Sequence, residues 1–283
     1  MIYEKISGFA DEIDANVVTQ FEALNRLNMK YFEPRRIDGK NISTLTDEEV
    51  VELKGKMDKY GIEVSSIGSP IGKVFIEDDF TEHFDLYKRV VYIAKALETK
   101  YIRMFSFYTK DGVWNREKRK VVIERLKMMI DYAKENGIVL LHENEKDIYG
   151  DTVDRCVDLM EELYCDNFKA VFDPANFVQS EQDTKYAYDK LYKYIEYMHI
   201  KDALIDGGRV VPSGMGDGNM EYVLKNLFDK GYKGFLSLEP HLGSFEGLAD
   251  LELDDKMLNL PKSGEGTFTI AYNALVDILK KIL

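Results

Sequence analysis

The sequence predicts an α/β protein, a single (β/α)8 TIM barrel that occupies residues 1–283 as one domain. Apolar runs of strand length alternate with amphipathic stretches of helical period along the whole chain. Several runs, such as Ile138-Val-Leu-Leu141, are continuously apolar, as expected of parallel strands covered on both faces. Glycine repeatedly stands between the end of a helical stretch and the next strand, which is typical of βα repeats.

The apolar runs predict eight strands, each followed by a helical segment. They lie near residues 3–9, 31–35, 62–68, 101–107, 138–143, 169–173, 195–201 and 234–239. Eight βα units in fewer than 300 residues correspond to the size of a (β/α)8 barrel. The alternative is an open doubly wound sheet with a nucleotide site, but no G-x-G-x-x-G follows the first strand.

The joints between helices and strands support the same fold. Thr46-Asp-Glu-Glu49 matches a capping box, which predicts that the second helix begins there. Gly61, Gly137 and Gly231 each precede a strand and predict helix ends in the left-handed conformation. Two connections are longer than a simple joint requires, residues 202–219 and 241–266, and long loops at the carboxyl ends of barrel strands commonly grip substrates.

Composition limits the classes of partner. The chain of 283 residues is 45% hydrophobic and carries a formal net charge of −13. A surface this acidic repels phosphate backbones, so we expect no nucleic-acid partner. No run approaches the ~18 apolar residues of a membrane span, and the first residues lack the pattern of a signal peptide. Cys156 and Cys165 are expected to be small buried residues of a reducing, cytoplasmic compartment, and association into a homo-oligomer stays open.

Four residues at the ends of successive strands in the second half of the chain are candidate metal ligands. They are Glu143, Asp173, His199 and Glu239, separated by 30, 26 and 40 residues, which suits one strand-plus-helix unit each. If the strands are parallel neighbours, the four side chains converge at one rim of the barrel. Three carboxylates and one imidazole form a mostly oxygen shell that suits Mn²⁺ or Mg²⁺ and tolerates Co²⁺ or Zn²⁺. This arrangement predicts an enzyme.

These residues resemble the xylose isomerase-like TIM barrels, a superfamily of sugar (phosphate) isomerases and epimerases that includes tagatose/psicose 3-epimerases, inosose dehydratases and endonuclease IV enzymes. The matching pieces cover nearly the whole chain in the family's order. They are Leu141-His-Glu143-Asn144, Phe172-Asp173-Pro-Ala-Asn176, Met198-His199-Ile-Lys201-Asp202, Pro212-Ser-Gly214-Met-Gly216-Asp-Gly218 and Ser237-Leu-Glu239.

The resemblance implies roles for these residues. Glu143, Asp173, His199 and Glu239 would be the metal ligands, with Glu143 and Glu239 also the acid/base pair. Glu33 and Arg35, on a segment similar to the family's Glu-x-Arg, would face the substrate. Asn176 stands where many members have a histidine that contacts a substrate hydroxyl or binds a further zinc, which argues against a three-zinc cluster and against ketohexose specificity.

Other residues near the rim have a structural and a functional interpretation. Lys201 is either a salt-bridged loop start or a cation near an anionic intermediate. Arg209 is either a solvated loop residue or a ligand for a substrate oxygen or phosphate. Four aromatic residues could form an apolar wall on which a sugar stacks, or belong to the core: Phe9, Phe105, Phe107 and Trp114.

The predicted reaction is proton transfer on a small carbohydrate. A cation that binds a carbonyl and a neighbouring hydroxyl stabilises an enediolate, while one glutamate removes a proton and the other returns one. This gives isomerisation or epimerisation. The alternatives are an inosose-dehydratase-like lyase, an endonuclease-like phosphodiesterase, and a metal-free sugar-binding barrel without catalysis.

Overall fold

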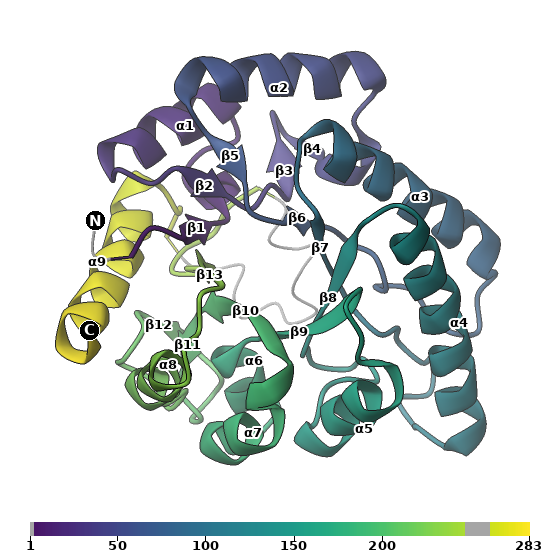
Figure 1. Ribbon diagram of the computed structural model, residues 1–283. Coiled ribbons are helices and arrows are strands. Elements are labelled where there is room, and N and C mark those ends of the chain that lie inside the picture. Colours follow the sequence, from purple (N-terminus) through teal and green to yellow (C-terminus); the bar gives the residue numbers. More distant parts are fainter. Residues whose placement is uncertain (1–2, 247–260) are drawn as a thin grey trace.

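The computed structural model describes residues 3–246 and 261–283. Part of the predicted long connection at residues 241–266 therefore lies outside the described residues. Within the described part, strands surround a central axis and helices cover them from outside (Figure 1). The predicted α/β barrel is confirmed.

All eight predicted strand positions carry strands. The strands that surround the axis are β1 (Ile6–Gly8), β2 (Tyr31–Phe32), β5 (Glu63–Val64), β6 (Ile67–Gly68), β7 (Tyr101–Met104), β8 (Val139–Glu143), β9 (Phe168–Phe172), β10 (Ile195–Ile200) and β13 (Phe235–Leu238). The third predicted strand is divided into β5 and β6. At the break, the Ser65 hydroxyl donates a hydrogen bond to the Phe32 carbonyl and lies within hydrogen-bond distance of the hydroxyl groups of Ser7 and Tyr197.

Seven of these strands form one parallel sheet in the order β1-β13-β10-β9-β8-β7-β6. β2 and β5 form a separate parallel pair. Backbone hydrogen bonds join this pair to both edges of the sheet: the Glu33 N–H donates to the Gly8 carbonyl, and the Gly68 N–H donates to the Pro34 carbonyl. The barrel is thus completed by a short pair of strands with few ladder hydrogen bonds of its own.

A helix follows every strand unit. The helices are α1 (Val17–Arg26), α2 (Asp47–Tyr60), α3 (Phe80–Ala96), α4 (Arg116–Glu135), α5 (Val153–Leu163), α6 (Pro174–Gln179), α7 (Thr184–Leu191), α8 (Met220–Asp229) and α9 (Glu265–Ile282). Two short antiparallel pairs decorate the loops: β3 (Arg36–Ile37) with β4 (Lys40–Asn41), and β11 (Asp202–Ala203) with β12 (Val210–Val211). None of the described helices is both long enough and apolar enough to cross a lipid bilayer.

The predicted helix boundaries at α2 are confirmed. Thr46 accepts from the Glu49 N–H, and Glu49 accepts from the Thr46 N–H, which completes the capping box. Gly61 ends the helix with φ of 68°, a left-handed conformation that costs glycine little.

The two predicted cysteine environments differ. Cys156 is buried and donates to the Gly150 carbonyl, as a small core residue does. Cys165 is also a free thiol but is exposed, so the prediction that both are buried is wrong for Cys165. It lies just after α5 in the short turn that leads into β9, outside the packed layer.

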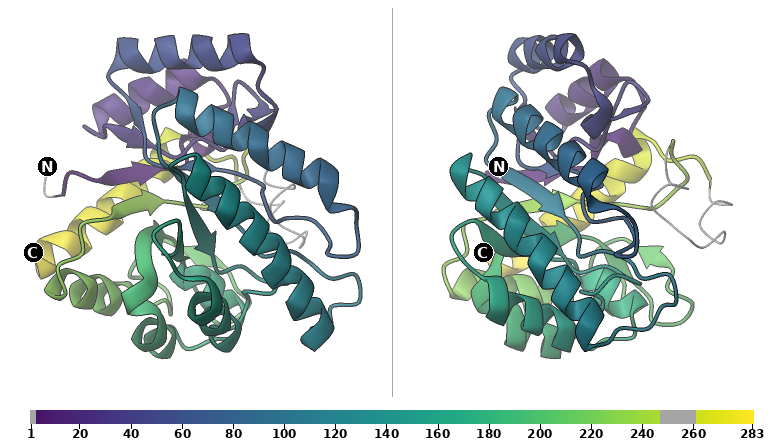
Figure 2. Two further views of the ribbon diagram at one scale, coloured as in Figure 1. Left: turned by 45° about the vertical axis from the view of Figure 1, so that its right-hand side comes forward. Right: turned by 90° about the vertical axis from the view of Figure 1, so that its right-hand side faces the viewer.

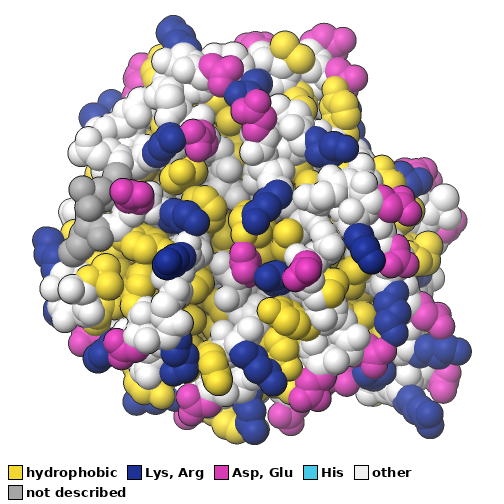
Figure 3. All heavy atoms as spheres, in the orientation of Figure 1, with side chains coloured by type: hydrophobic (Ala, Val, Ile, Leu, Met, Phe, Trp, Pro, Cys, Tyr) yellow, Lys and Arg dark blue, Asp and Glu magenta, His cyan; other side chains and the backbone are white. Residues whose placement is uncertain are grey.

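The face drawn in Figure 3, at the amino ends of the barrel strands, shows basic and acidic side chains mixed across it. No histidine is visible on this face. All four histidines, His83, His142, His199 and His241, are buried.

Candidate metal centre

Alternation along the strands decides which side chains face the axis of the barrel. In β8, Val139 and Leu141 pack in a small interior cluster with Val171 of β9 and Tyr197 of β10. Successive side chains of a strand point to opposite faces. Glu143 therefore shares the interior face with Leu141, whereas His142 points outward, where its ring lies against Phe168 and Gly150.

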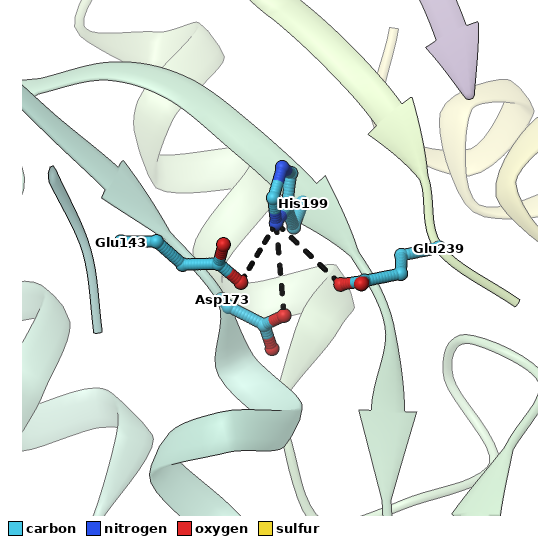
Figure 4. A group of neighbouring side chains, drawn as sticks. All are labelled: Glu143, Asp173, His199 and Glu239. Carbon is cyan, nitrogen blue, oxygen red and sulfur yellow. Dashed lines mark hydrogen bonds and ion pairs between the residues drawn. The ribbon is translucent and has the colours of Figure 1, made fainter. Parts of the chain in front are cut away.

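The same alternation brings the four predicted ligands together. Asp173 follows β9, His199 lies in β10 and Glu239 follows β13, each in register with the interior positions of its strand. One ligand atom from each residue lies within 4.8 Å of the others, and all four residues are buried. Figure 4 shows Glu143 and Glu239 approaching from opposite sides, with Asp173 and His199 between them.

The imidazole is the centre of this group. His199 Nδ1 lies 3.0 Å from Glu143 Oε1, 3.5 Å from Glu239 Oε2 and 3.9 Å from Asp173 Oδ2. Donor atoms around an ion with bonds of ~2.1 Å lie about 3–4 Å apart, so these separations already match a coordination shell. Asp173 Oδ2 is buried and accepts no hydrogen bond, and its neighbour is the ammonium group of Lys201 at 3.1 Å, so the oxygen lies where a cation is favoured. The residues therefore fit a hard divalent ion.

Three outer residues hold the ligands in place. Glu33 lies behind the imidazole, 3.4 Å from His199 Nε2, and accepts from the Tyr197 hydroxyl and the Ser237 hydroxyl. A carboxylate at this position fixes the ring so that Nδ1 faces the other ligands. Asn144 exchanges two hydrogen bonds with the backbone of Asp173.

Asn176 holds a third ligand. Its side-chain N–H donates to Glu143 Oε1 at 3.1 Å and to the Asn144 carbonyl at 2.9 Å. The backbone N–H of Asn176 also donates to the Asp173 carboxylate, which caps α6. Asn176 thus contacts two of the predicted ligands.

Buried cations border the acidic ligands. Lys201 Nζ lies 3.0 Å from Glu239 and 3.1 Å from Asp173. Arg103 Nε lies 3.2 Å from Glu143. Buried charges are strongly destabilising unless paired, so these cations and the carboxylates depend on each other in the ion-free protein.

The pairing sets the proton affinities of the ligands. Burial alone would raise the pKa of Glu143, but His199 and Arg103 outweigh burial and lower it to about 2. Burial likewise opposes ionisation of Glu239, yet Lys201 and the surrounding cations hold its pKa well below its usual range. Asp173 differs, because burial outweighs Lys201 and raises its pKa to about 7.

The proton on the imidazole is also stabilised. Burial lowers the pKa of His199, but Glu143 and Glu33 outweigh burial and raise it well above its usual range. Without a metal ion, the imidazolium thus joins Lys201 and Arg103 in balancing the charge of the carboxylates.

The side chain of Arg35 is engaged by other residues of the protein rather than free to bind a substrate. Its guanidinium is buried, donates to both oxygens of Asp11 at 2.9 and 3.2 Å, and lies over the rings of Phe9 and Phe245. A weaker contact at 3.4 Å reaches Glu239 Oε1. Arg35 therefore joins the acidic residues after β1 to one member of the predicted acid/base pair.

Arg209 lies apart from the cluster. It is exposed, and its backbone carbonyl accepts from the Leu204 N–H in the hairpin that joins β11 to β12. That hairpin depends on Asp202, whose carboxylate accepts from the N–H groups of Ala203, Gly214, Gly216 and Gly218. A Cβ at Gly218 would lie 2.6 Å from this carboxylate, so the glycine-rich motif shapes the loop around Asp202.

Three charged residues beside the cluster were not predicted as site residues: Arg103, Asp11 and Glu12. Arg103 interrupts the apolar run Tyr101-Ile-Arg-Met104. It stands two residues after Tyr101, so the alternation of side chains along a strand predicts that both face the interior. Asp11 and Glu12 follow the first strand directly and bind Arg35. Burial raises the pKa of Glu12 to about 7.

The four aromatic candidates lie in four different environments. Phe9 lies edge-on to His199 at 5.3 Å between ring centroids, beneath the ligand cluster. Phe105 lies under the guanidinium of Arg103. Phe107 is fully buried in the helix-side core, and Trp114 lines a separate cavity.

Comparisons with known proteins agree with this geometry. The family model described as Xylose isomerase-like TIM barrel matches residues 21–256. A search of curated proteins finds no match.

Solved structures share the fold along nearly the whole chain. The IOLI protein with a bound zinc atom is 19% identical, covers 99% of each chain and has a TM-score of 0.76. D-allulose 3-epimerase from Methylomonas sp. is 16% identical, with 99% of this chain and 98% of that chain covered and a TM-score of 0.76. A xylose isomerase-like TIM barrel protein from Mycobacterium smegmatis in complex with magnesium is 17% identical, with the same coverage and a TM-score of 0.71.

Proposed function

The chain belongs to the Xylose isomerase-like TIM barrel family, and from this premise we propose that it is a divalent-metal-dependent sugar isomerase or epimerase. The observation that carries the proposal is the placement of Glu143 and Glu239 on opposite sides of His199 and Asp173 (Figure 4). Two carboxylates that face each other across a cation site can exchange protons with both faces of one small substrate.

Glu143, Asp173, His199 and Glu239 would hold the ion, with Mn²⁺ or Mg²⁺ favoured by the three carboxylates and Zn²⁺ or Co²⁺ tolerated. When bound, the ion supplies Lewis-acid stabilisation of negative charge on the substrate's oxygens. The protein supplies the proton transfers. One glutamate removes a proton from a C–H bond next to the substrate carbonyl, and the other returns a proton to the opposite face or to the adjacent carbon.

The two glutamates need different surroundings to perform different steps. Glu143 is bordered by Arg103 and Asn176, whereas Glu239 is bordered by Lys201 and Arg35. Burial lowers the pKa of Lys201, but Asp173 and Glu239 outweigh burial and raise it well above its usual range, so Lys201 stays a cation. We therefore propose that Lys201, which lies beside Glu239, stabilises the negative charge that develops on the enediolate.

Glu33, Arg35 and Asn176 take supporting roles in this proposal. Glu33 orients His199, and Asn176 orients Glu143 and would offer its amide oxygen to a substrate hydroxyl. Arg35 acts on the substrate through Glu239. Arg209 would contact substrate from the β11–β12 hairpin, and of the predicted contacts it is the one with the least support from the geometry.

We propose a small-molecule carbohydrate as substrate rather than a nucleic acid. The net charge of −13 opposes a polyanion. Asn176 also supplies no imidazole for a further zinc ion, which separates this site from a three-zinc phosphodiesterase.

The test combines metal content with hydrogen exchange. Protein purified without chelator is analysed for divalent metals, loaded with Mn²⁺, and incubated with a panel of sugars in deuterated water. The proposal predicts about one ion per chain and deuterium at a carbon next to the carbonyl. Loss of water with a new unsaturated chromophore would identify the dehydratase alternative, and the absence of metal and of exchange on every sugar would overturn the proposal.

A further inference from the structure

The interior side chains one layer below the metal ligands are not uniformly apolar. Two residues before Glu143 and Asp173 lie Leu141 and Val171, which belong to one apolar interior cluster. Beside this cluster the layer contains a carboxylate and four hydroxyl groups, each on a residue at most 1% exposed: Ser7, Glu33, Ser65, Tyr197 and Ser237. Bulky apolar side chains usually fill the interior of a TIM barrel, and a buried polar group is costly unless it is hydrogen-bonded. This polar layer is therefore maintained by contacts among its members.

Two of these hydroxyl groups converge on the same carboxylate oxygen. The Tyr197 hydroxyl donates to Glu33 Oε2 at 2.8 Å, and the Ser237 hydroxyl donates to the same oxygen at 2.7 Å. The Ser65 hydroxyl lies 2.9 Å from the Tyr197 oxygen and 2.6 Å from the Ser7 oxygen, which extends the contacts to β1. Hydrogen bonds to a carboxylate are stronger than those between neutral groups. The position of Glu33 Oε2 is therefore fixed by side chains from β10 and β13.

Glu33 is held between two cations. Its Oε2 atom lies 3.4 Å from His199 Nε2, and its Oε1 atom lies 4.0 Å from Arg103 Nε. Within the described residues, Oε1 accepts no hydrogen bond. A rotation of the carboxylate toward Arg103 would bring it closer to the guanidinium and would separate it from the imidazole. The two hydroxyl groups on Oε2 oppose this rotation, so they keep the carboxylate beside His199.

The orientation of the His199 ring depends on what lies on each side of it. Nδ1 faces the three carboxylate ligands, and Nε2 faces Glu33. A ring turned over about its Cβ–Cγ bond would place carbon atoms at both positions. An outer carboxylate that pairs with the second ring nitrogen selects the first orientation. The carboxylate ligands therefore meet a nitrogen rather than a carbon as long as Glu33 stays in place.

We propose that Tyr197 and Ser237 are positioning residues of the metal centre. Their hydroxyl groups hold Glu33 against His199, and Glu33 keeps Nδ1 directed at the other three ligands. This role requires the metal centre proposed above but neither the sugar nor the reaction. Loss of an outer contact of this kind typically lowers metal affinity by about 10- to 100-fold. Because the effect passes through two side chains, Tyr197→Phe should raise the Kd for Mn²⁺ by about tenfold, the lower end of this range.

Calorimetric titration with Mn²⁺ measures this affinity in the wild-type protein and in two hydroxyl variants, Tyr197→Phe and Ser237→Ala. Tyr87→Phe is the matched control, because Tyr87 is also fully buried and its hydroxyl donates to the Met129 carbonyl at 2.8 Å. Tyr87 lies on α3, which is on the outside of the barrel in both views of Figure 2. The hydroxyl variants should bind Mn²⁺ more weakly, and Tyr87→Phe should bind it as the wild type does. Equal losses at Tyr197 and Tyr87, or wild-type affinity in both hydroxyl variants, would overturn the proposal.

A double-mutant cycle shows whether Tyr197 acts through Glu33. In Glu33→Ala the link between the hydroxyl groups and His199 is absent, so adding Tyr197→Phe should change the Kd by less than about twofold. A further tenfold loss would show that Tyr197 acts on the ion by another route and would contradict the positioning role. The same cycle with Ser237→Ala alters a smaller side chain, so a folding defect at Tyr197 does not decide the result.

The ring of His199 is also observed directly in the ion-free protein. In proton–nitrogen correlation spectra, the His199 ring signals are those lost in His199→Gln. The hydroxyl variants should shift the Nε2 signal, because Glu33 moves away from it, whereas Tyr87→Phe should leave it in place.

These measurements separate the positioning role from the proposed function. Wild-type protein that binds Mn²⁺ but exchanges no sugar hydrogen, with weaker binding in the hydroxyl variants, keeps the positioning role and removes the isomerase. Hydrogen exchange on a sugar, with wild-type affinity and an unchanged ring signal in both hydroxyl variants, keeps the isomerase and removes the positioning role.

Discussion

The two halves of the barrel rim make different contributions to the candidate site. The half from β8 to β13 contributes the four predicted metal ligands. The half from β1 to β7 contributes Arg35 and Arg103, and both guanidinium groups lie over the ring of Phe9, at 4.6 and 5.5 Å. The difference shows that the predicted acid/base pair is held from the other side of the barrel: Arg103 contacts Glu143, and Arg35 contacts Glu239.

Removing the predicted acid/base groups tests the ligand half and should have the largest effect. Glu143→Gln or Glu239→Gln removes a proton acceptor and leaves a similar shape, so exchange of substrate hydrogen at saturating Mn²⁺ should fall by about 10²- to 10⁴-fold. Deuterium incorporation measured by mass spectrometry gives the rate.

Glu196→Gln is the matched control for this pair, because Glu196 lies toward the amino end of β10 and pairs with Lys169 at 3.4 Å, away from the cluster. It should keep full exchange. Wild-type rates in both acid/base variants would contradict their assignment.

Removing the guanidinium of Arg103 tests the half of the rim from β1 to β7. Arg103→Met leaves Glu143 buried beside fewer cations, and breaking a buried ion pair in this way costs about 3–5 kcal/mol of unfolding free energy. A bound Mn²⁺ would neutralise Glu143 instead, so the loss should shrink when the ion is present. Urea unfolding with and without Mn²⁺ measures both values.

Arg116→Met provides the comparison for this experiment, since Arg116 is exposed at the start of α4 and should change stability by less than about 0.5 kcal/mol. If Arg103→Met loses the same free energy with and without Mn²⁺, Glu143 is not a ligand.

The convergence of the four predicted ligands could be predicted from the sequence because its evidence is local. Each ligand stands at the end of an apolar run, and the order of runs places the ends at one rim. The arginine half depends on which face of a short strand meets the interior and on contacts between distant segments. Asp11 and Arg35 are 24 residues apart, and Arg35 and Glu239 are 204 residues apart.

The places of Glu33 and Arg103 were the part of the site that the sequence did not predict. Glu33 was expected to face the substrate, but its place behind His199 follows only from its side-chain contacts with Tyr197 and Ser237. Arg103 appeared as an irregularity in an apolar run, although strand alternation places it inside. The cytoplasmic location and the association of copies have no test in the fold and stay predictions.

The affinity for a metal ion should depend on pH, because carboxylates from both halves of the rim act on the pKa of His199. Glu33 and Glu143 raise the pKa of His199 well above its usual range, so the ion-free protein carries a proton there at pH 7. A cation that binds Nδ1 must release this proton, so affinity rises with pH, by up to about tenfold per pH unit for each proton released. Asp173, with a pKa of about 7, adds to the dependence below that pH.

Calorimetry of Mn²⁺ binding in two buffers with different ionisation enthalpies counts the protons released. Release of at least one proton near pH 7 is expected. An affinity that does not change between pH 6 and pH 8, the range on either side of Asp173's pKa, would remove His199 from the ligand set.

The smallest effect is expected at Arg209, which belongs to neither half. Its side chain is exposed on the β11–β12 hairpin, so Arg209→Ala should change the unfolding free energy by less than about 0.5 kcal/mol and leave Mn²⁺ affinity unchanged. If the side chain contacts substrate, the variant raises KM and spares kcat, because the contact binds substrate without taking part in proton transfer. Lys280→Ala, exposed on α9, is the surface control. A fall in kcat as large as that of Glu143→Gln would instead place Arg209 in the chemistry, and the site would then require the hairpin to close over the metal-ligand half.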